Sequence, residues 1–393
     1  MKKMKVLHIL NELKYSGAEI MYVDAAPVFQ QLGCELLVVN TSEDLGEFAP
    51  AFREVGYKVF HEPYHFRCRE VWKRYEWMQR MVTLIRENNV DVVHIHAARL
   101  RGIMSYVAWK AGARSVYTFH NVFRSDSSLG YAKGFVQRWA AKHVFGCKFQ
   151  TISNSVYTNE RNYWHDKTTL VYNWYGKRRF YPVSEHERQA SRRELGLNDD
   201  ELVLISVGGC SPVKRHTDVI KALPVLIGKG HKVVYLHLGE GVSLDEEKQL
   251  AQDLGVGGNV RFLGNKRNVR DYLAAADVYV MPSRYEGISI TTIEAMACKI
   301  PCVLYNVPGL CDFNKELECS RMIPESYEQL AEAVEYLYNN PSEQHRLTEN
   351  GFSFISKYFD MEKNARRIFD LYMGGVILIS LTQAESKEWR AAA

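Results

Sequence analysis

The sequence predicts an α/β protein with two doubly wound parallel sheets. Short apolar runs alternate with helical segments along the chain, which is typical of parallel strands that helices cover on both faces. This alternation pauses after residue 152 and starts again at residue 202, as two separate sheets would require. The length of 393 residues also suits two domains better than one.

The expected strands follow in chain order. The first half contains five apolar runs, at Val6–Leu10, Leu36–Val39, Val92–Ile95, Val116–Phe119 and Phe149–Ile152. The second half contains five more, at Leu202–Val207, Val233–Leu238, Val260–Leu263, Val278–Met281 and Cys302–Leu304. Helical segments are expected between the later strands, at 217–226, 246–254 and 327–339.

The boundary between the halves is expected in a polar segment with Gly and Pro, 173–182, which a short polar stretch follows. We therefore expect domains over residues 1–178 and 179–358, and a last amphipathic helix over 359–373. The remaining tail, 374–393, fits no element, so we expect it to be disordered or foreign to the native chain.

The composition excludes several classes of protein. A formal net charge of +4 is too small to indicate nucleic-acid binding, although it suits an anionic substrate or acidic lipid. The eight cysteines form no Cys-x-x-Cys pair, so neither a disulfide framework nor a zinc site is indicated. The apolar run after Met1–Lys5 is too short for a signal peptide, and no run reaches the roughly 20 residues of a membrane span. A cytoplasmic protein is expected, with peripheral contact at the inner face of the plasma membrane as a further option.

Two carboxylates, Glu286 and Glu294, stand eight residues apart around the start of a predicted helix. Glu286 lies on the loop that leaves the strand 278–281, at the end of the sheet where open α/β folds bind ligands. Glu294 lies inside the helix that begins near Ser289. A helix N-terminus offers N–H groups to phosphate, and carboxylates accept hydrogen bonds from sugar hydroxyls. A nucleotide sugar would use all of these groups.

In each half of the chain, a turn that contains glycine follows the first expected strand. Gly208 and Gly209 precede Lys214, an arrangement that suits a phosphate but is also ordinary turn chemistry. Gly17 follows the first strand of the chain and either admits a ligand or simply starts a closely packed helix. Neither turn has the G-x-G-x-x-G pattern, which disfavours a dinucleotide-dependent dehydrogenase.

Histidines end two strands of the first half. His120 follows the strand 116–119 and is expected to face the ligand crevice. His94 and His96 have the spacing of a metal pair but lack a third ligand at a suitable spacing, so we expect one to be packed and the other to line the crevice. The chain also lacks an Asp-x-Asp pair, which commonly holds the divalent ion of a nucleotide-sugar site, so no metal and no cofactor are expected.

Two stretches mix basic and aromatic side chains. One spans residues 72–80, and the other spans 123–148 and contains Arg124, Lys133, Arg138, Lys142 and Lys148. Each stretch suits either a normal amphipathic helix that packs on its own domain or a surface that contacts a membrane or an amphiphilic acceptor. Sequence alone leaves both readings open.

Taken together, these motifs resemble glycosyltransferase family 4, the retaining glycosyltransferases with the GT-B fold, of the bacterial cell-surface polysaccharide type. Glu286-Gly287 with Glu294–Ala297 resembles the E-x7-E signature of the family, and Pro282-Ser283 precedes it as the family pattern has it. Ser16–Glu19 is similar to the family's first glycine turn, and Val207-Gly208 with Lys214 is similar to its phosphate segment. The resemblance implies two Rossmann-like domains that face each other across a cleft, with the last helix crossing back to the first domain.

The resemblance also implies roles for individual residues. Glu286, His120 and Lys214 would be catalytic: Glu286 holds the donor sugar, His120 touches it from the other domain, and Lys214 stabilises the leaving phosphate. Glu294 would accept hydrogen bonds from the ribose, and the segment 264–269 would hold the base. The other expected donor-binding residues are Gly17, Gly208, Gly209, Arg215, Gly287, Ile288, Ser289, Ile290 and Thr291. Gly209 stands where the family commonly has a second cation, an arginine, and the side chain of Arg215 is expected to point away from the phosphate that this arginine would contact.

The expected function is therefore a retaining, metal-independent glycosyltransferase. It would move a sugar from a nucleotide-sugar donor, with UDP as the nucleotide, to a hydroxyl of a glycan or lipid-linked glycan. Two alternatives stay open. One is a non-catalytic scaffold subunit that binds the nucleotide sugar, which the missing arginine favours. The other is a sugar-nucleotide epimerase, which would turn over without an acceptor.

Overall fold

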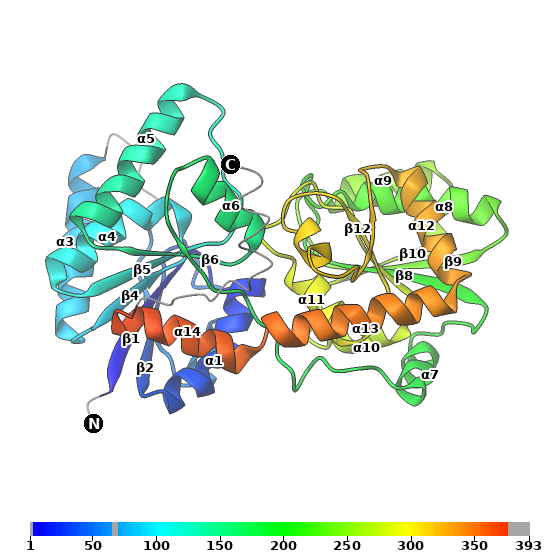
Figure 1. Ribbon diagram of the computed structural model, residues 1–393, viewed down its shortest axis with the longest axis horizontal. Helices are drawn as coiled ribbons and strands as arrows, with labels where there is room; N and C mark the ends of the chain where they lie inside the picture. Colours follow the sequence, from blue (N-terminus) through cyan, green and yellow to red (C-terminus); the bar gives the residue numbers. More distant parts are fainter. Residues whose placement is uncertain (1–2, 65–69, 376–393) are drawn as a thin grey trace.

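The computed structural model describes residues 3–64 and 70–375, which form two α/β domains that lie side by side (Figure 1). The first domain holds a seven-stranded sheet in the order β3-β2-β1-β4-β5-β6-β7. The second holds a six-stranded sheet in the order β10-β9-β8-β11-β12-β13. Every recorded pairing between these strands is parallel, so the prediction of two doubly wound sheets is confirmed.

The strands of the first sheet are β1 (Met4–Leu10), β2 (Cys34–Asn40), β3 (Lys58–His61), β4 (Val92–Ile95), β5 (Arg114–Phe119), β6 (Lys148–Thr151) and β7 (Thr169–Leu170). Those of the second are β8 (Glu201–Val207), β9 (Lys232–Leu238), β10 (Val260–Gly264), β11 (Val278–Met281), β12 (Cys302–Tyr305) and β13 (Arg321–Ile323). Helices cover both faces, so the central strands are buried along most of their length and read as continuous apolar runs.

The helices of the first domain are α1 (Gly17–Gln31), α2 (Ala49–Glu54), α3 (Val71–Glu87), α4 (Arg101–Ala111), α5 (Ser128–Trp139) and α6 (Asn154–Asn162). Those that follow are α7 (Glu185–Glu194), α8 (His216–Gly228), α9 (Leu244–Asp253), α10 (Val269–Ala275), α11 (Ile290–Ala297), α12 (Tyr327–Tyr338), α13 (Pro341–Tyr358) and α14 (Met361–Met373). Short 3-10 or π turns occur at Ala98–Leu100, Ala140–Val144, Gly257–Asn259 and Cys311–Asn314.

Several elements escaped the sequence prediction, among them three strands and two helices. Strands β3, β7 and β13 are short and lie at or next to sheet edges, so they carry no long apolar run. The polar stretch after the expected boundary forms helix α7, which begins with a capping box between Ser184 and Glu187. The buried residues of α7 are Ser191 and Arg192, so its sequence has no regularly spaced apolar residues that would predict a helix. Helix α13, with Pro341 in its first turn, was also missed.

The chain passes between the two domains twice. The first passage runs from the end of β7 to the start of α7, and the second joins α13, which packs on α11, to α14, which packs on α1 (Figure 1). The passages touch, because Asn364 Nδ2 donates a hydrogen bond to the carbonyl of Asn173 over 3.2 Å and Lys177 pairs with Asp360. Of the tail expected over 374–393, residues 376–393 lie outside the described residues.

Candidate active site

A cavity of about 710 Å³ lies between the two domains, at the carboxyl ends of β1, β8 and β11. The first domain contributes Tyr15–Ala18, Asp24 and His120 to its lining, and the first passage contributes Trp174 and Arg179. The second domain contributes Gly208, Gly209, Lys214, Asn265–Arg267, Glu286, Ile288–Thr291 and Glu294. The cavity therefore collects most of the site residues that the sequence singled out.

Glu286 and Lys214 form an ion pair in the cavity wall. Lys214 Nζ donates to Glu286 Oε1 over 2.6 Å, and Ser283 Oγ donates to the same oxygen over 2.7 Å. The Glu286 loop is held against Gly309, where an added Cβ would lie 2.3 Å from the carbonyl oxygen of Glu286. Gly309 has a φ of +83°, so the turn needs a glycine for both space and conformation.

The N-terminus of α11 opens into the same cavity. Ser289 caps the helix by accepting a hydrogen bond from the Thr292 N–H over 3.2 Å. Thr291 Oγ1 donates to the carbonyl of Val207 over 3.0 Å, which fixes the helix start against the end of β8. The first N–H groups of a helix have no partner inside it, so those at Ile290 and Thr291 are available to a phosphate.

Glu294 lies one turn further along α11 and is buried. Burial raises the pKa of its carboxyl to about 8, although Arg179 at 3.9 Å opposes that rise. Arg179 also contacts Asp24 of α1 at 3.2 Å, so it links a carboxylate of each domain. Neither Arg179 nor Asp24 is recognisable as a site residue in the sequence, because Arg179 lies in an apparent linker and Asp24 lies on a helix without a motif.

A chain of hydrogen-bonded histidines leads away from the cavity. His120 Nε2 shares a hydrogen bond with His96 Nδ1 at 3.0 Å, and His96 Nε2 shares one with His8 Nδ1 at 3.1 Å. Burial lowers the pKa of His120 to about 4 and that of His8 to about 3, so both rings are neutral at pH 7. Of these rings, His120 lines the cavity.

Two expectations about the histidines were wrong. A third ligand does stand near His94 and His96, because β1 pairs with β4 and sets His8 opposite His94. His96 does not line the cavity but is buried behind His120. His94 is packed, with Tyr372 OH at 2.6 Å and Thr118 Oγ1 at 2.7 Å from its ring nitrogens.

Two glycines, Gly17 and Gly287, allow the two domains to approach each other closely. A Cβ on Gly287 would lie 1.8 Å from the carbonyl oxygen of His120, and one on Gly17 would lie 2.7 Å from Cδ1 of Ile290. Gly287 itself is not among the lining residues, so it meets the opposite backbone rather than the cavity. Gly17 lines the cavity and lets α1 reach the start of α11.

Arg215, one of the expected donor-binding residues, lies outside the cavity lining, so this expectation is wrong. Arg215 takes a left-handed conformation, with a φ of +52°, just before α8. Its guanidinium pairs with Asp218 at 2.8 Å and with Glu325, away from the cavity lining. In contrast, Lys266 and Arg267 from the segment expected to hold the base do line the cavity, and Arg267 lies over the Tyr15 ring at 5.4 Å.

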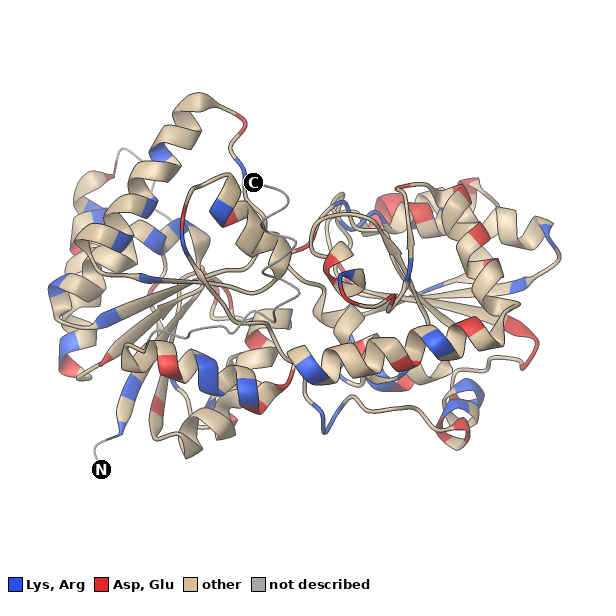
Figure 2. Ribbon diagram, in the orientation of Figure 1, with Lys and Arg blue, Asp and Glu red and all other residues tan. Residues whose placement is uncertain are grey.

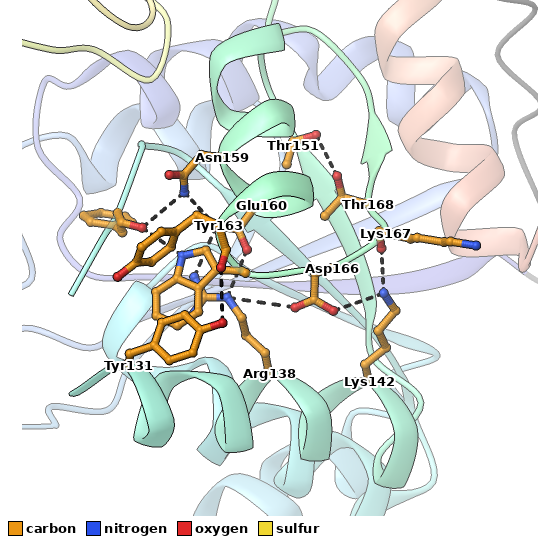
Figure 3. A network of polar contacts seen from close by, with 12 residues as sticks. Tyr131, Arg138, Lys142, Thr151, Asn159, Glu160, Tyr163, Asp166, Lys167 and Thr168 are labelled. Atoms are coloured by element: carbon orange, nitrogen blue, oxygen red, sulfur yellow. Dashed lines mark hydrogen bonds and ion pairs between the residues drawn. The ribbon is translucent and has the colours of Figure 1, made fainter. Parts of the chain in front are cut away.

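The basic side chains of the stretch 123–148 are largely engaged within the domain (Figure 3). Arg138 is buried and donates to both carboxylate oxygens of Glu160, at 2.9 and 3.1 Å. Lys142 reaches Asp166 at 3.3 Å, and Arg124 donates to Asn159 Oδ1 at 3.0 Å. On α5, Lys133 is the basic residue left exposed, and the other exposed side chains include apolar ones such as Leu129 at 82%. The stretch is therefore not an open basic surface.

Comparison with known proteins decides the family. The family model described as Glycosyltransferase Family 4 matches residues 15–208, and the model described as Glycosyl transferases group 1 matches residues 187–354. The chain belongs to glycosyltransferase family 4. Together the two models span both domains, including the Glu286 and Glu294 motif, and the fold is GT-B.

Individual relatives are similar at a lower level. An N-acetyl-alpha-D-glucosaminyl L-malate synthase of Bacillus anthracis is 27% identical over 244 residues, which is 59% of this chain and 60% of that protein. The capsular polysaccharide biosynthesis glycosyltransferase CapH of Staphylococcus aureus is 22% identical, over 74% of this chain and 78% of its own. The crystal structure of Anabaena HepE in complex with UDP-glucose superposes with a TM-score of 0.80 at 19% identity, covering 94% of this chain and all of that one.

Proposed function

We propose that this family 4 glycosyltransferase is retaining and metal-independent, and that it transfers a sugar from a UDP-linked donor to a hydroxyl of a glycan or lipid-linked glycan in cell-surface polysaccharide synthesis. One observation carries the proposal. A single interdomain cavity brings together the Lys214–Glu286 pair, the α11 N-terminus and Glu294, which match the phosphate, sugar and ribose of such a donor. UDP and UDP-glucose complexes of HepE, and the name of CapH, support the nucleotide and the pathway class.

The charges of the cavity favour electrostatic stabilisation of the leaving diphosphate. Lys214, Arg179, Lys266 and Arg267 line it, so cationic side chains supply the charge that a divalent ion would otherwise supply. In the transfer step, the bond from the sugar to the phosphate oxygen breaks and the acceptor oxygen bonds to the same face of the sugar. The acceptor proton passes to the departing phosphate oxygen. The neutral ring of His120 would touch the sugar by hydrogen bonding rather than by proton transfer at pH 7.

We also propose that the acceptor is amphiphilic and that the first domain makes peripheral contact with a membrane. Trp72 on α3 is 70% exposed, and Leu129, Val136 and Trp139 on α5 are also exposed. Figure 2 shows basic but no acidic residues on α5. Of these basic residues, Arg138 is buried and cannot face a membrane. Contact would therefore depend on the exposed aromatic and aliphatic side chains more than on charge. Among the described residues, no helix has the length and apolar character that crossing a bilayer requires.

A donor screen tests the proposal. The purified protein is titrated by calorimetry with UDP-, GDP-, ADP- and dTDP-sugars in buffer without added Mg²⁺ or Mn²⁺. We expect UDP-sugar binding under these conditions, transfer to a glycan acceptor, and retention of the anomeric configuration in the product by NMR. Transfer that starts only after Mg²⁺ or Mn²⁺ is added would contradict metal independence. Binding without transfer would favour the scaffold, and conversion of the donor without acceptor would favour the epimerase.

A further inference from the structure

A second group of ligand-type side chains lies beneath the loop that follows β8. Cys210 stands on that loop, His237 on β9 and Glu247 on α9, so three separate elements bring them together. All three are buried, with exposures of 1%, 0% and 1%. None of them lines the interdomain cavity.

The donor atoms of this group face one another. Cys210 Sγ lies 3.0 Å from His237 Nε2, and Glu247 Oε2 lies 3.8 Å from the same nitrogen. All three atoms lie within 4.8 Å of one another. Ligand atoms around one tetrahedral zinc ion are about 3.3–3.7 Å apart, since Zn–S is about 2.3 Å and Zn–N and Zn–O are about 2.0–2.2 Å. Small side-chain rotations would bring all three to one ion.

Glu247 is the group that most needs a partner. Among the described residues, its buried Oε2 has no hydrogen-bond partner, and no lysine or arginine forms an ion pair with it. Burying a carboxylate that no lysine or arginine neutralises is costly. A cation between the three side chains would remove that cost.

His237 is held in the orientation that a ligand requires. Its Nδ1 shares a hydrogen bond with Ser206 Oγ at 3.1 Å, and Ser206 Oγ also contacts Tyr235 OH. The far side of the ring is therefore fixed, and Nε2 is left to face Cys210 and Glu247. Metal-binding histidines are commonly oriented in this way by a hydrogen bond from the other ring nitrogen.

We propose that Cys210, His237 and Glu247 bind one Zn²⁺ ion through Sγ, Nε2 and Oε2. Thiolate, imidazole and carboxylate are the donor types that zinc prefers, and the fourth position would take water. Binding displaces the proton of the Cys210 thiol, and that of Glu247 where it is protonated, into solvent. The spacing of these residues in sequence hides the site, because it contains no Cys-x-x-Cys or His-x-His pair.

The ion would hold the phosphate loop rather than act in transfer. Cys210 follows Gly209, which lines the cavity. Cys210 N–H donates to the carbonyl of Glu240 at 3.1 Å, and its carbonyl accepts from Ser243 N–H at 3.2 Å. A zinc ion that joins Cys210 Sγ to β9 and α9 would therefore hold the backbone between β8 and Lys214 in one conformation. Because the ion takes no part in the transfer step, that step stays metal-independent.

The histidine group of the first domain is the competing site and fits an ion less well. The nitrogens of His94 are hydrogen-bonded to Tyr372 and Thr118, and those of His96 to His8 and His120. Of the six nitrogens of His8, His94 and His96, the unpartnered one is Nε2 of His8. An ion there would have to break several of these hydrogen bonds.

The test measures metal directly. The purified full-length protein is stripped by a chelator, and Zn²⁺ is added back and counted by mass spectrometry. We expect one tightly held Zn²⁺ per chain in the wild type, and its loss in Cys210→Ser and Glu247→Gln. Cys319→Ser, at another buried cysteine that belongs to no candidate ligand group among the described residues, and His8→Asn are expected to keep the ion. Circular dichroism confirms that each variant is folded.

Co²⁺ provides a readout that needs no variant. Bound to the stripped wild type, it is expected to show a thiolate-to-cobalt charge-transfer band in the near ultraviolet, and a raised melting temperature. Absence of metal binding, bound Co²⁺ without the thiolate band, or full Zn²⁺ retention in both ligand variants would each overturn the proposal. None of these measurements depends on transferase activity.

Discussion

Lys214 donates a hydrogen bond to Glu286 over 2.6 Å, from the loop after β8 to the loop after β11. The cation assigned to the leaving phosphate and the carboxylate assigned to the donor sugar are thus direct neighbours. The pair keeps two partly buried charges compensated and holds both side chains at the cavity. A donor would have to engage both partners at once, because its phosphate and its sugar are themselves adjacent.

Substitutions of this pair are expected to remove turnover without unfolding the protein. Lys214→Ala and Glu286→Ala should each lower kcat/KM by about 10²–10³, the usual cost of losing one stabilising contact to a developing charge. The free energy of unfolding should change by only about 1 kcal/mol, because the pair is partly exposed to solvent. Lys221→Ala, an exposed lysine on α8, serves as the control. Near-normal turnover in either site variant would contradict the assignment.

Glu294 should make stability depend on pH. Burial raises its pKa to about 8, from an ordinary value of 4.5, so the folded protein keeps a proton that the unfolded chain releases. Its contribution is therefore fully present below about pH 4.5 and is lost as pH rises through about 8. Between about pH 5 and 8, wild-type stability should fall more steeply than that of Glu294→Gln, by up to about 1.4 kcal/mol per pH unit. Urea unfolding of both proteins measures this, and equal slopes would refute the role of Glu294.

Gly287→Ala should hold the domains apart. The new Cβ would lie 1.8 Å from the His120 carbonyl oxygen, which belongs to the other domain's backbone and cannot yield by a side-chain rotation. We expect a larger radius of gyration in solution scattering and weaker donor binding in the same preparation. Gly102→Ala, where an added Cβ meets nothing within 4 Å, is the control. Identical scattering curves for the two variants would rule out this contact as a determinant of domain closure.

The membrane proposal predicts a loss of vesicle binding in a Leu129→Ser, Trp139→Ser double variant. These exposed side chains on α5 would bury apolar area in the lipid interface, and serine removes that area. Sedimentation with vesicles that contain acidic lipid should show binding for the wild type and at least a several-fold decrease for the variant. Val242→Ser, at the most exposed large apolar residue of the second domain, should bind like the wild type. Equal binding by all three proteins would argue against contact through α5.

The sequence predicts the donor side of the site well because that side follows strand ends. Glu286, Lys214 and the α11 N-terminus lie on loops that leave β8 and β11, and neighbouring parallel strands bring such loops together. Arg179 and Asp24 could not be found in this way, since their meeting depends on how the first passage crosses α1. His8 was overlooked because strand pairing between β1 and β4, rather than spacing along the chain, sets it beside His94.

The same limit applies to the surface of α5. The sequence shows Arg138 as one basic residue among several, but Glu160 on α6 draws it into the interior, where it also stacks on Trp164 at 3.6 Å. Such a pairing needs the relative placement of two helices, which composition does not contain. Two of the missed elements show the same limit. Strand β3 depends on pairing with its neighbour in the sheet, and α7 depends on its N-terminal capping box, so neither shows periodic apolar residues.

The two passages between the domains have a consequence for proteolysis. Asn364 and Asp360 on the second passage bond to Asn173 and Lys177 on the first, and α14 is packed on α1. A single cut in the first passage would thus leave a two-chain complex that behaves as one particle, with the C-terminal fragment still supplying a helix to the N-terminal one. The N-terminal half therefore lacks one of its covering helices when it is produced alone, so it should be obtained in folded form only when it is expressed together with the C-terminal half.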